Sequence, residues 1–552
     1  MPPKKNFLKT KPKSKAKSQE PQSENDFLET ADEFEQAAGK WRAGDAAKAT
    51  RFFNRAIDMY NEGLKRYPRS FDLAYNKANL EYSITEDERI VSQLGSKTAL
   101  LEETLNSHRF AISLNPRNTD ILFNAAQVLT SLAEASLESG TQEAAQVPAR
   151  TLLEEAVDIF TRCLISQQQE YEQMQSEIAK AQASGEYQKA WEGGGVPLEN
   201  VQVEEEETKT ASSSPEAPGD WATVEEPLTP ETILDTCIAQ LGALTTLLGL
   251  YDPSDLSNIE KKGHDGTDTA TAKIPALISL IETSPSLKVK DEPNAGPTLS
   301  LGASAVEEVT TTPKDDAILA IANFQATIAE VTYRSGRSNA TQYAQTVEQI
   351  FAKLTANTEG TASSDLAAAN IRSSYADALI DLASALTDGT HYTPSSPTFS
   401  TDTEIQWTAL TQAQTLLTQL SSTPYATILS ASRLADIFLA RGDIDLFRFK
   451  ITLYDSAKPA WVKSRAVLVG NSGVFYRGAR TYAEKAGAVK VRSTADAKAI
   501  VAEVLKEVSS GSQEKKAHWK GRSSDVAKVL EQMVAEGIVG RENVEGVLRC
   551  VE

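Results

Sequence analysis

The 552-residue sequence has little of what most catalytic and metal sites require, with only three cysteines and four histidines. Cys163, Cys237 and Cys550 lie far apart, so their spacing shows neither a metal site nor a disulfide framework. A reducing compartment is then the default expectation. No Walker-type phosphate loop and no G-x-S-x-G nucleophile motif occurs. We therefore expect a protein that is not an enzyme and that carries no cofactor or metal.

The sequence also lacks long apolar runs and an excess of basic residues. No stretch approaches 18 apolar residues and the N-terminus lacks a signal-peptide core, so we expect no membrane span and a cytoplasmic or nuclear protein. The formal net charge of -20 at pH 7 argues against direct nucleic-acid binding, which needs cations for the phosphates. An acidic body favours a basic protein partner, because complementary charge steers encounter.

What the sequence has in abundance is helical periodicity. Apolar and small residues recur at spacings of three and four, and three segments between residues 34 and 164 share one arrangement of them. Each segment places small residues where two helices would cross closely. The first and third segments add an aromatic residue between the helices, and the second ends with a proline where its second helix would stop. These residues are Ala49, Phe53 and Ala56 in the first segment, Ala78, Ala111 and Pro116 in the second, and Ala126, Ala156, Phe160 and Cys163 in the third.

This arrangement resembles the tetratricopeptide (TPR) repeat, a helix-turn-helix unit that stacks on its neighbours. The resemblance covers residues 34–164 most clearly and implies an all-α fold, a TPR-like α-solenoid of roughly seven to nine helix pairs in a right-handed superhelix. The first segment departs from the family because Pro68 comes seven residues late. Its second helix should therefore be about two turns longer than usual.

Composition divides the chain into four parts. We expect a disordered basic tail at 1–25, an N-terminal TPR-like array at 26–190, a disordered acidic linker at 191–229 and a C-terminal helical-repeat array at 230–552. The last part should contain loop insertions near 252–271, 288–313 and 388–401, a short helix at 274–281, and a helix-pair turn at Gly442–Asp443.

The tail and the linker each carry a candidate functional element. The tail is rich in lysine and reads as a nuclear import signal or as a solubilising leader: Lys4, Lys5, Lys11, Lys13, Lys15 and Lys17. The linker combines an acidic run with one tryptophan: Glu204, Glu205, Glu206, Glu207 and Trp221. Trp221 either packs the end of the linker onto the next helix or belongs to an acidic-aromatic element that regulates the scaffold's own groove.

The TPR resemblance also implies where a partner would bind. In that family the residue two positions before the small crossing residue points into the concave groove, and here it is Asn76 in the second segment and Asn124 in the third. An amide can both donate to and accept from an extended peptide backbone. The alternative is that these asparagines are only tolerated surface residues.

One well-known use of TPR domains is disfavoured. Domains that dock the carboxylate tails of heat-shock chaperones carry a lysine and an asparagine in the first segment, an asparagine in the second and a lysine-arginine pair in the third. Only the second-segment asparagine is matched, by Asn76, because the other positions hold Ala31 and Glu35, then Asp120 and Asn124. Without a cation at these positions the two-carboxylate clamp cannot form.

The sequence as a whole indicates a protein-binding scaffold for a basic client. The acidic net charge and the lysine-rich tail are both explained if the protein is an assembly or escort chaperone for a ribosomal or other nucleic-acid-binding protein. Two alternatives remain open. One is a structural subunit of a multiprotein or RNA-processing complex, and the other is a regulatory adaptor whose acidic linker is autoinhibitory.

Overall fold

The structure, a computed structural model, describes residues 21–139, 142–183, 228–283, 311–357, 364–389, 391–511, 519 and 521–551. The chain divides into two compact units, Met1–Ser166 and Gln167–Glu552. The boundary between them lies inside one long helix, α7 (Gln142–Ala183). The reason is that few residues of α7 after Gln167 are buried, so the helix continues beyond the core that it helps to form.

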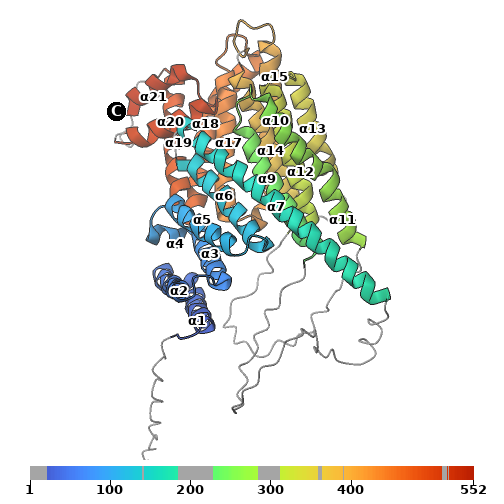
Figure 1. Cartoon of the computed structure of the whole chain (residues 1–552). Helices are drawn as coiled ribbons and strands as arrows, with labels where there is room; N and C mark the ends of the chain where they lie inside the picture. Colours follow the sequence, from blue (N-terminus) through green and yellow to red (C-terminus); the bar gives the residue numbers. More distant parts are fainter. Residues whose placement is uncertain are drawn as a thin grey trace, which may run out of the picture. The chain divides into compact units, whose positions relative to one another are not determined.

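Unit 1 contains three helix pairs, drawn in blue to cyan in Figure 1. Its helices are α1 (Glu24–Arg42), α2 (Ala46–Arg66), α3 (Phe71–Thr85), α4 (Glu88–Leu94), α5 (Lys97–Leu114), α6 (Thr119–Ser139) and the first half of α7. The pairs are α1 with α2, α3 with α5, and α6 with α7. Helix α2 is long, as the late proline predicted, and the enlarged turn of the second pair contains the short helix α4.

Local sequence explains where these helices begin and how they pack. The Ser23 hydroxyl accepts from the Asp26 amide while the Asp26 carboxylate accepts from the Ser23 amide, which is a capping box at the start of α1. The small crossing residues Ala49 and Ala56 are fully buried. Gly63 brings α2 close to α1 and α3, because a Cβ atom there would lie 3.0 Å from Leu73.

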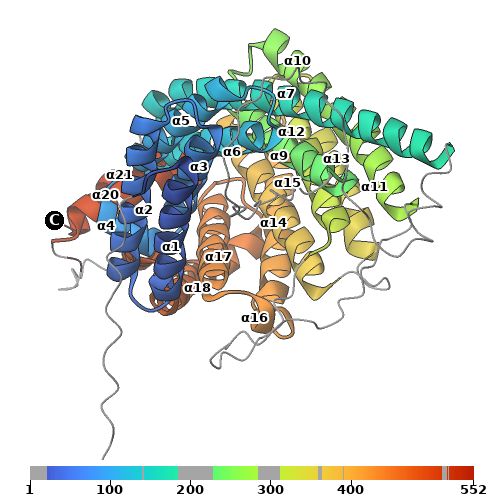
Figure 2. The same cartoon turned by 60° about the horizontal axis from the view of Figure 1, so that its bottom comes forward.

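Unit 2 is also all-α in its described residues, where the helix contacts define five more helix pairs. Its helices are drawn from green to red in Figure 2. Its helices are α9 (Pro230–Gly249), α10 (Leu256–Asp268), α11 (Ile274–Thr283), α12 (Pro313–Arg334), α13 (Ala340–Asn357), α14 (Asp365–Asp388), α15 (Phe399–Leu420), α16 (Tyr425–Ile428), α17 (Ala431–Ile451), α18 (Pro459–Ala486), α19 (Val489–Ser509), α20 (Ser523–Ala535) and α21 (Val544–Val551). The described residues contain no β-strand. The predicted all-α solenoid of seven to nine helix pairs is confirmed.

The pairs of unit 2 form two layers. In each pair, the helix that comes earlier in the chain is the first helix. The first helices α9, α12 and α14 contact one another in order. Helix α14, for example, also contacts its own second helix, α15, and the second helix of the preceding pair, α13. Helices α17 and α19 continue the first layer, and α18 and α20 the second. This alternation is what a stack of helix hairpins produces, because each hairpin buries its apolar stripes against its neighbours.

The predicted loop at 252–271 is wrong. Residues 256–283 form one continuous helical segment in which α10 passes through a π-helical turn, η1 (Thr269–Lys273), into α11. Gly263 and Gly266, which suggested a loop, instead permit close packing: a Cβ atom on Gly266 would lie 2.3 Å from the Phe324 ring. The wide turn precedes Pro275, whose ring would clash with a carbonyl four residues earlier in a regular helix.

The predicted helix-pair turn at Gly442–Asp443 is also wrong, because α17 runs unbroken from Ala431 to Ile451. A Cβ atom on Gly442 would lie 2.4 Å from the Tyr476 ring, so the glycine allows α18 to approach α17. Asp443 accepts a hydrogen bond from the Tyr476 hydroxyl at 2.7 Å. Tertiary contact, and not a turn, accounts for both residues.

The other predicted insertions have mixed outcomes. The loop near 388–401 is shorter than expected, since α14 extends to Asp388 and α15 begins at Phe399. Most of 288–313 lies outside the described residues, and α12 starts at Pro313 behind the capping residue Thr312. The candidate lysines of the tail, Lys4 to Lys17, and the linker residues Glu204 to Glu207 and Trp221 also lie outside them.

Helix α9 is the one described helix that is long and apolar enough to cross a membrane. Of its apolar window, 56% is buried inside the structure. Leu241, Leu244 and Leu247 are fully buried, and the helix packs against α10, α11 and α12. Helix α9 therefore has the apolar composition of a core helix, because these residues pack inside the protein.

Candidate functional site

The first-helix layer of unit 2 carries a set of carboxylates that sequence reasoning did not single out. Asp377 and Asp381 lie one turn apart on α14, and both side chains are exposed to solvent. Surrounding protein nevertheless raises the pKa of Asp377 from 3.8 to about 6 and that of Asp381 to about 7. The first cause is desolvation by neighbouring protein, which disfavours the charged form although part of each side chain reaches solvent.

Neighbouring first helices extend this charge on both sides of α14. Glu330 on α12 is the nearest like charge to Asp381 and raises its pKa further. Asp316, at the start of α12, does the same to Asp235 on α9, where burial is again the larger cause. Asp316 and Glu330 lie 14 residues apart on one side of α12, so the charged region extends about 21 Å along that helix.

Helix α17 contributes the last member, Asp436, whose pKa is also raised by burial. It lies three residues after Arg433, the cation nearest to Asp377, and therefore on the same side of α17. We call the six carboxylates together the acidic face: Asp235, Asp316, Glu330, Asp377, Asp381 and Asp436.

The acidic face is only partly neutralised by its own arginines. Arg334 bridges Glu330 at 2.7 Å and Asp388 at 2.9 Å, so its charge is shared between two carboxylates. Arg433 donates to the Asn370 side chain at 2.6 Å and lowers the pKa of Asp377 by its charge alone. Carboxylates with raised pKa values and incomplete pairing gain from a cation supplied by a ligand.

Unit 1 places the two predicted asparagines in different surroundings. The Asn76 amide donates to the backbone carbonyl of Asp72, one turn earlier on α3, at 2.8 Å. The Asn124 amide on α6 donates instead to the Asn79 side chain on α3 at 2.9 Å. The structure therefore joins Asn124 to Asn79 and shows no direct bond between Asn76 and Asn124. Asn79 could have been found from the sequence, because it lies one helical turn after Asn76.

Two tyrosines continue this contact between α3 and α6. Tyr82 lies 3.4 Å from the Ser131 hydroxyl on α6. The pKa of Tyr75 is raised by burial and, to a smaller extent, by the charge of Asp120 on α6, while its hydrogen bond with Asn79 opposes the rise. We call Tyr75, Asn79, Tyr82, Asn124 and Ser131 the amide ladder. It offers hydroxyl and amide groups, which can bond to a peptide backbone without selecting its sequence.

The positions that a chaperone-tail clamp would use are occupied by other interactions. Ala31 is fully buried, and Glu35 accepts a hydrogen bond from the Tyr60 hydroxyl on α2 at 2.7 Å. Burial raises the pKa of Glu35 above its ordinary value. A second carboxylate brought to this position would be repelled and not held.

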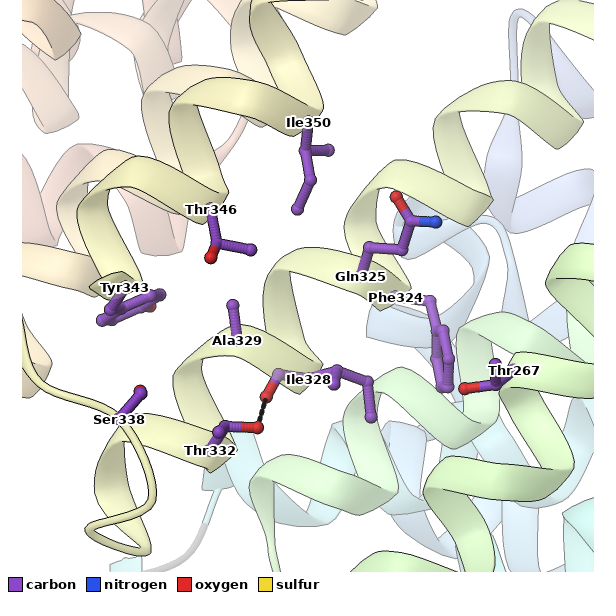
Figure 3. A pocket seen from close by; sticks show the side chains of 10 residues that line it. All are labelled: Thr267, Phe324, Gln325, Ile328, Ala329, Thr332, Ser338, Tyr343, Thr346 and Ile350. Carbon is purple, nitrogen blue, oxygen red and sulfur yellow. Dashed lines mark hydrogen bonds between the residues drawn. The ribbon is translucent and has the colours of Figure 1, made fainter. Parts of the chain in front are cut away.

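Unit 2 also contains an apolar hollow of about 340 Å³ between α12 and α13. Figure 3 shows Ala329 of α12 on the side of Tyr343, Thr346 and Ile350 of α13, while Ile328 points to the other side, toward Phe324 and Thr267. The Thr332 hydroxyl at its edge is bonded to the Ile328 carbonyl at 2.6 Å and so is not available to a ligand. The lining has no charged group but includes the polar side chains of Gln325, Ser338 and Thr346, so the hollow suits an uncharged group.

The described residues hold no set of three or more His, Cys, Asp or Glu side chains that could bind a metal ion. His108 is completely buried, with Nδ1 2.9 Å from the Thr104 carbonyl oxygen, and burial lowers its pKa. Burial raises the pKa of the Cys237 thiol to about 12, which keeps it protonated and unreactive. These groups serve packing and not chemistry.

Comparison with known proteins found similarity in sequence and in structure. No family model matches the chain. The UPF0656 protein C926.02 of Schizosaccharomyces pombe is 28% identical over 178 residues, which cover 30% of this chain and 39% of that protein. The match thus spans about two fifths of the length of the curated relative.

The structural neighbour is described as a circular tandem repeat protein with novel repeat topology and enhanced subunit contact surfaces. It matches 95% of this chain and 92% of its own, at 14% sequence identity and a TM-score of 0.27. At that TM-score the likeness carries no argument. The helical repeat architecture rests on the helix pairs themselves.

Proposed function

We propose that this helical repeat scaffold binds a basic protein client on the acidic face of unit 2 and acts as an assembly or escort chaperone. The client class is a ribosomal or other nucleic-acid-binding protein, because such proteins carry clusters of lysine and arginine that need shielding before they reach RNA or DNA. An escort must hold its client firmly but reversibly. Charge pairing at an accessible surface meets that need, because it weakens with salt and with competing polyanions.

The observation that supports this proposal best is the state of Asp377 and Asp381. Two accessible carboxylates one turn apart have raised pKa values, and Glu330 adds a third negative charge beside Asp381. A bound lysine or arginine would lower these pKa values and bring the carboxylates to full charge. The gain on binding is therefore specific to a cationic ligand, and an acidic or neutral peptide does not obtain it.

The test is a binding titration with the full chain. A dye-labelled peptide of alternating lysine and glycine is followed by fluorescence anisotropy at 50 and at 300 mM salt. The double variant Asp377→Asn/Asp381→Asn should weaken binding roughly threefold to tenfold at low salt, since one exposed ion pair contributes up to about 1 kcal/mol. The difference between variant and native chain should shrink at high salt.

The matched control removes the same charge elsewhere. Glu531→Gln/Glu545→Gln neutralises two exposed carboxylates on α20 and α21, outside the first-helix layer around α14. If the peptide binds at the acidic face, and not through the overall charge of the chain, this control should change peptide affinity by less than a factor of two. Equal loss of affinity in both double variants would show that the chain attracts cations only through its overall charge, and the proposed site would be abandoned.

A second experiment separates an escort from a permanent subunit. Affinity purification from cells should recover one basic protein in equal amount to the scaffold, and that protein should dissociate as salt is raised. A large assembly that resists high salt would favour the structural-subunit alternative.

Delivery to the nucleus rests on the lysine tail. We propose that Lys4, Lys5, Lys11, Lys13, Lys15 and Lys17 form an import signal. Replacing all six by glutamine in a fluorescent fusion should shift the protein toward the cytoplasm. An unchanged distribution would leave the tail as a solubilising leader.

A further inference from the structure

Unit 1 contains a pocket that is separate from both the acidic face and the amide ladder. It has a volume of about 450 Å³ and lies between the second helices α2 and α5, with α3 as its floor. Its apolar walls come from Ile57 and Leu64 of α2, Ala74 of α3 and Phe110 of α5. We call it the second-helix pocket.

The polar groups of this pocket carry an excess of negative charge. Glu81 of α3 and Glu103 of α5 line it together with one cation, Lys77. The Lys77 ammonium lies 3.2 Å from Glu81 Oε1 and donates to the Ser107 hydroxyl at 3.1 Å. Glu103 is exposed, so its charge acts from the rim.

Glu81 is the distinctive residue of the pocket. Its side chain is 14% exposed, and its second oxygen, Oε2, has no hydrogen-bond partner among the described residues. Burial is the first cause of a raised Glu81 pKa, and the charge of Lys77 opposes it. A buried carboxylate oxygen without a donor is costly, because the desolvation of the group is not repaid. A ligand cation in the pocket would add to the partial neutralisation that Lys77 provides.

Phe110 supplies the second recognition element. It is a large apolar side chain left 41% exposed at the edge of the pocket. An aromatic ring beside a carboxylate suits arginine better than lysine, because the planar guanidinium stacks on a ring face while its N–H groups bond to the carboxylate. The apolar walls suit the aliphatic part of the same side chain.

The pocket lies on a different side of α3 from the amide ladder. Ala74, Lys77 and Glu81 follow one another at spacings of three and four and face α2 and α5. Asn79 lies two positions away from both Lys77 and Glu81 and is bonded to α6. A ligand in the pocket therefore contacts unit 1 through a surface that the TPR resemblance does not predict.

We propose that the second-helix pocket binds one arginine side chain of the basic client, with its guanidinium on Glu81 and stacked against Phe110. This inference rests on the proposed function, because it assumes the same basic client. The occupant follows from charge complementarity: two carboxylates and one ammonium line a pocket that also offers an aromatic ring. The pocket adds a preference for arginine, because it offers the exposed ring of Phe110 together with carboxylates.

The experiment uses the full chain and two peptides, hexa-arginine and hexa-lysine, each with a photo-reactive group at one end. Cross-linked sites are identified by mass spectrometry after irradiation. Hexa-arginine should label the α5 segment around Phe110 at least several-fold more than hexa-lysine. Glu81→Gln should reduce this labelling about tenfold, since a charge-assisted hydrogen bond contributes about 1.5–3 kcal/mol.

Two further variants make the result decisive. Phe110→Ala removes an exposed ring, so folding is not at risk, and it should lower labelling by hexa-arginine more than by hexa-lysine. Glu35→Gln is the matched control, because Glu35 is also a partly buried carboxylate of unit 1 with a raised pKa but is bonded to Tyr60 outside the pocket. It should leave the labelling of α5 unchanged.

The outcomes separate this inference from the proposed function. Labelling of α5 that persists in Glu81→Gln, or that is equal for both peptides, overturns the arginine pocket. Asp377→Asn/Asp381→Asn should lower overall peptide affinity and leave α5 labelling in place. If that double variant has no effect while α5 labelling still depends on Glu81, the pocket stands and the acidic face fails.

Discussion

Lys498 and Asp443 form a buried ion pair between α19 and α17, with the ammonium 2.9 Å from Oδ1 and 2.8 Å from Oδ2 of the carboxylate. The Lys498 side chain is 6% exposed and that of Asp443 is 17% exposed. Tyr476 of α18 donates its hydroxyl to the same carboxylate, so three helices meet at one charge. This cluster holds together the last pairs of the solenoid.

Removing one partner of this pair should be costly. Lys498→Met leaves Asp443 as a buried carboxylate without its cation, and we expect a loss of roughly 3–5 kcal/mol in the stability of unit 2. Tyr476→Phe removes one neutral donor and should cost about 1 kcal/mol or more. Because a two-unit chain need not unfold in a single step, hydrogen exchange of peptides from α17 and α19 is the suitable measurement. Equal protection in Lys498→Met and the native chain would contradict this role.

The glycine in the middle of α17 should be intolerant of substitution. In Gly442→Ala the new Cβ atom would lie 2.4 Å from the Tyr476 ring, and overpacking of this kind costs typically 1–3 kcal/mol. Gly470→Ala on α18 is the matched control, because nothing lies within 4 Å of its Cβ position. The control should stabilise by roughly 0.5–1 kcal/mol, the helix preference of alanine over glycine. Thermal unfolding should therefore shift in opposite directions in the two variants.

Binding of a basic peptide should depend on pH between about 8 and 6. Asp377 and Asp381 have pKa values of about 6 and about 7, so both lose charge as pH falls through this window. Affinity should fall with them, while Arg334 and Arg433 beside them stay charged. Asp377→Asn/Asp381→Asn should show a flatter profile, which assigns the pH dependence to these two carboxylates. A profile as steep as that of the native chain would contradict the assignment.

The same pKa shifts predict that the stability of unit 2 rises as pH falls, whereas peptide affinity falls. The folded pKa values of Asp377 and Asp381 lie above the ordinary 3.8, so the folded chain binds protons more tightly than the unfolded chain. Their contribution is therefore complete below about pH 4 and is lost as pH rises through 6 and 7. Unit 2 should become more resistant to urea on mild acidification. The double asparagine variant should lose this gain when the two are compared at pH 7.5 and 5.5.

Substituting each of the two predicted asparagines should distinguish a structural role from a role in peptide binding. Asn124→Ala removes the bond to Asn79 across α3 and α6 and should destabilise unit 1 by about 0.5–1.5 kcal/mol. Asn76→Ala loses only a bond to its own helix and should change stability by less than about 0.5 kcal/mol. If Asn76 faces a bound peptide, its variant should still weaken peptide binding. Native affinity in Asn76→Ala would leave it as an ordinary surface residue.

Much of the helical framework follows from local sequence. Thr229 precedes Pro230 at the start of α9, and the Thr229 hydroxyl accepts from the Thr232 amide there, a cap that local sequence explains. Pro68 predicted the long α2, and the alternation of small and aromatic residues predicted the buried positions Ala49, Phe53 and Ala56. These features depend on neighbours within a few helical turns, which is the range over which periodicity and capping act.

The tertiary structure decided what local sequence could not. Gly263, Gly266 and Gly442 suggest a loop or turn when only their neighbours are considered, yet each lies inside a helix, with an aromatic or isoleucine side chain from another helix against it. Asp377 and Asp381 resemble any other exposed acidic pair until α12 and α17 surround them and raise their pKa values. By itself, then, the sequence determined the solenoid of helix pairs and its acidic character. Which carboxylates and which pocket form candidate sites was decided by long-range packing, because hydration and pairing depend on residues distant in the chain.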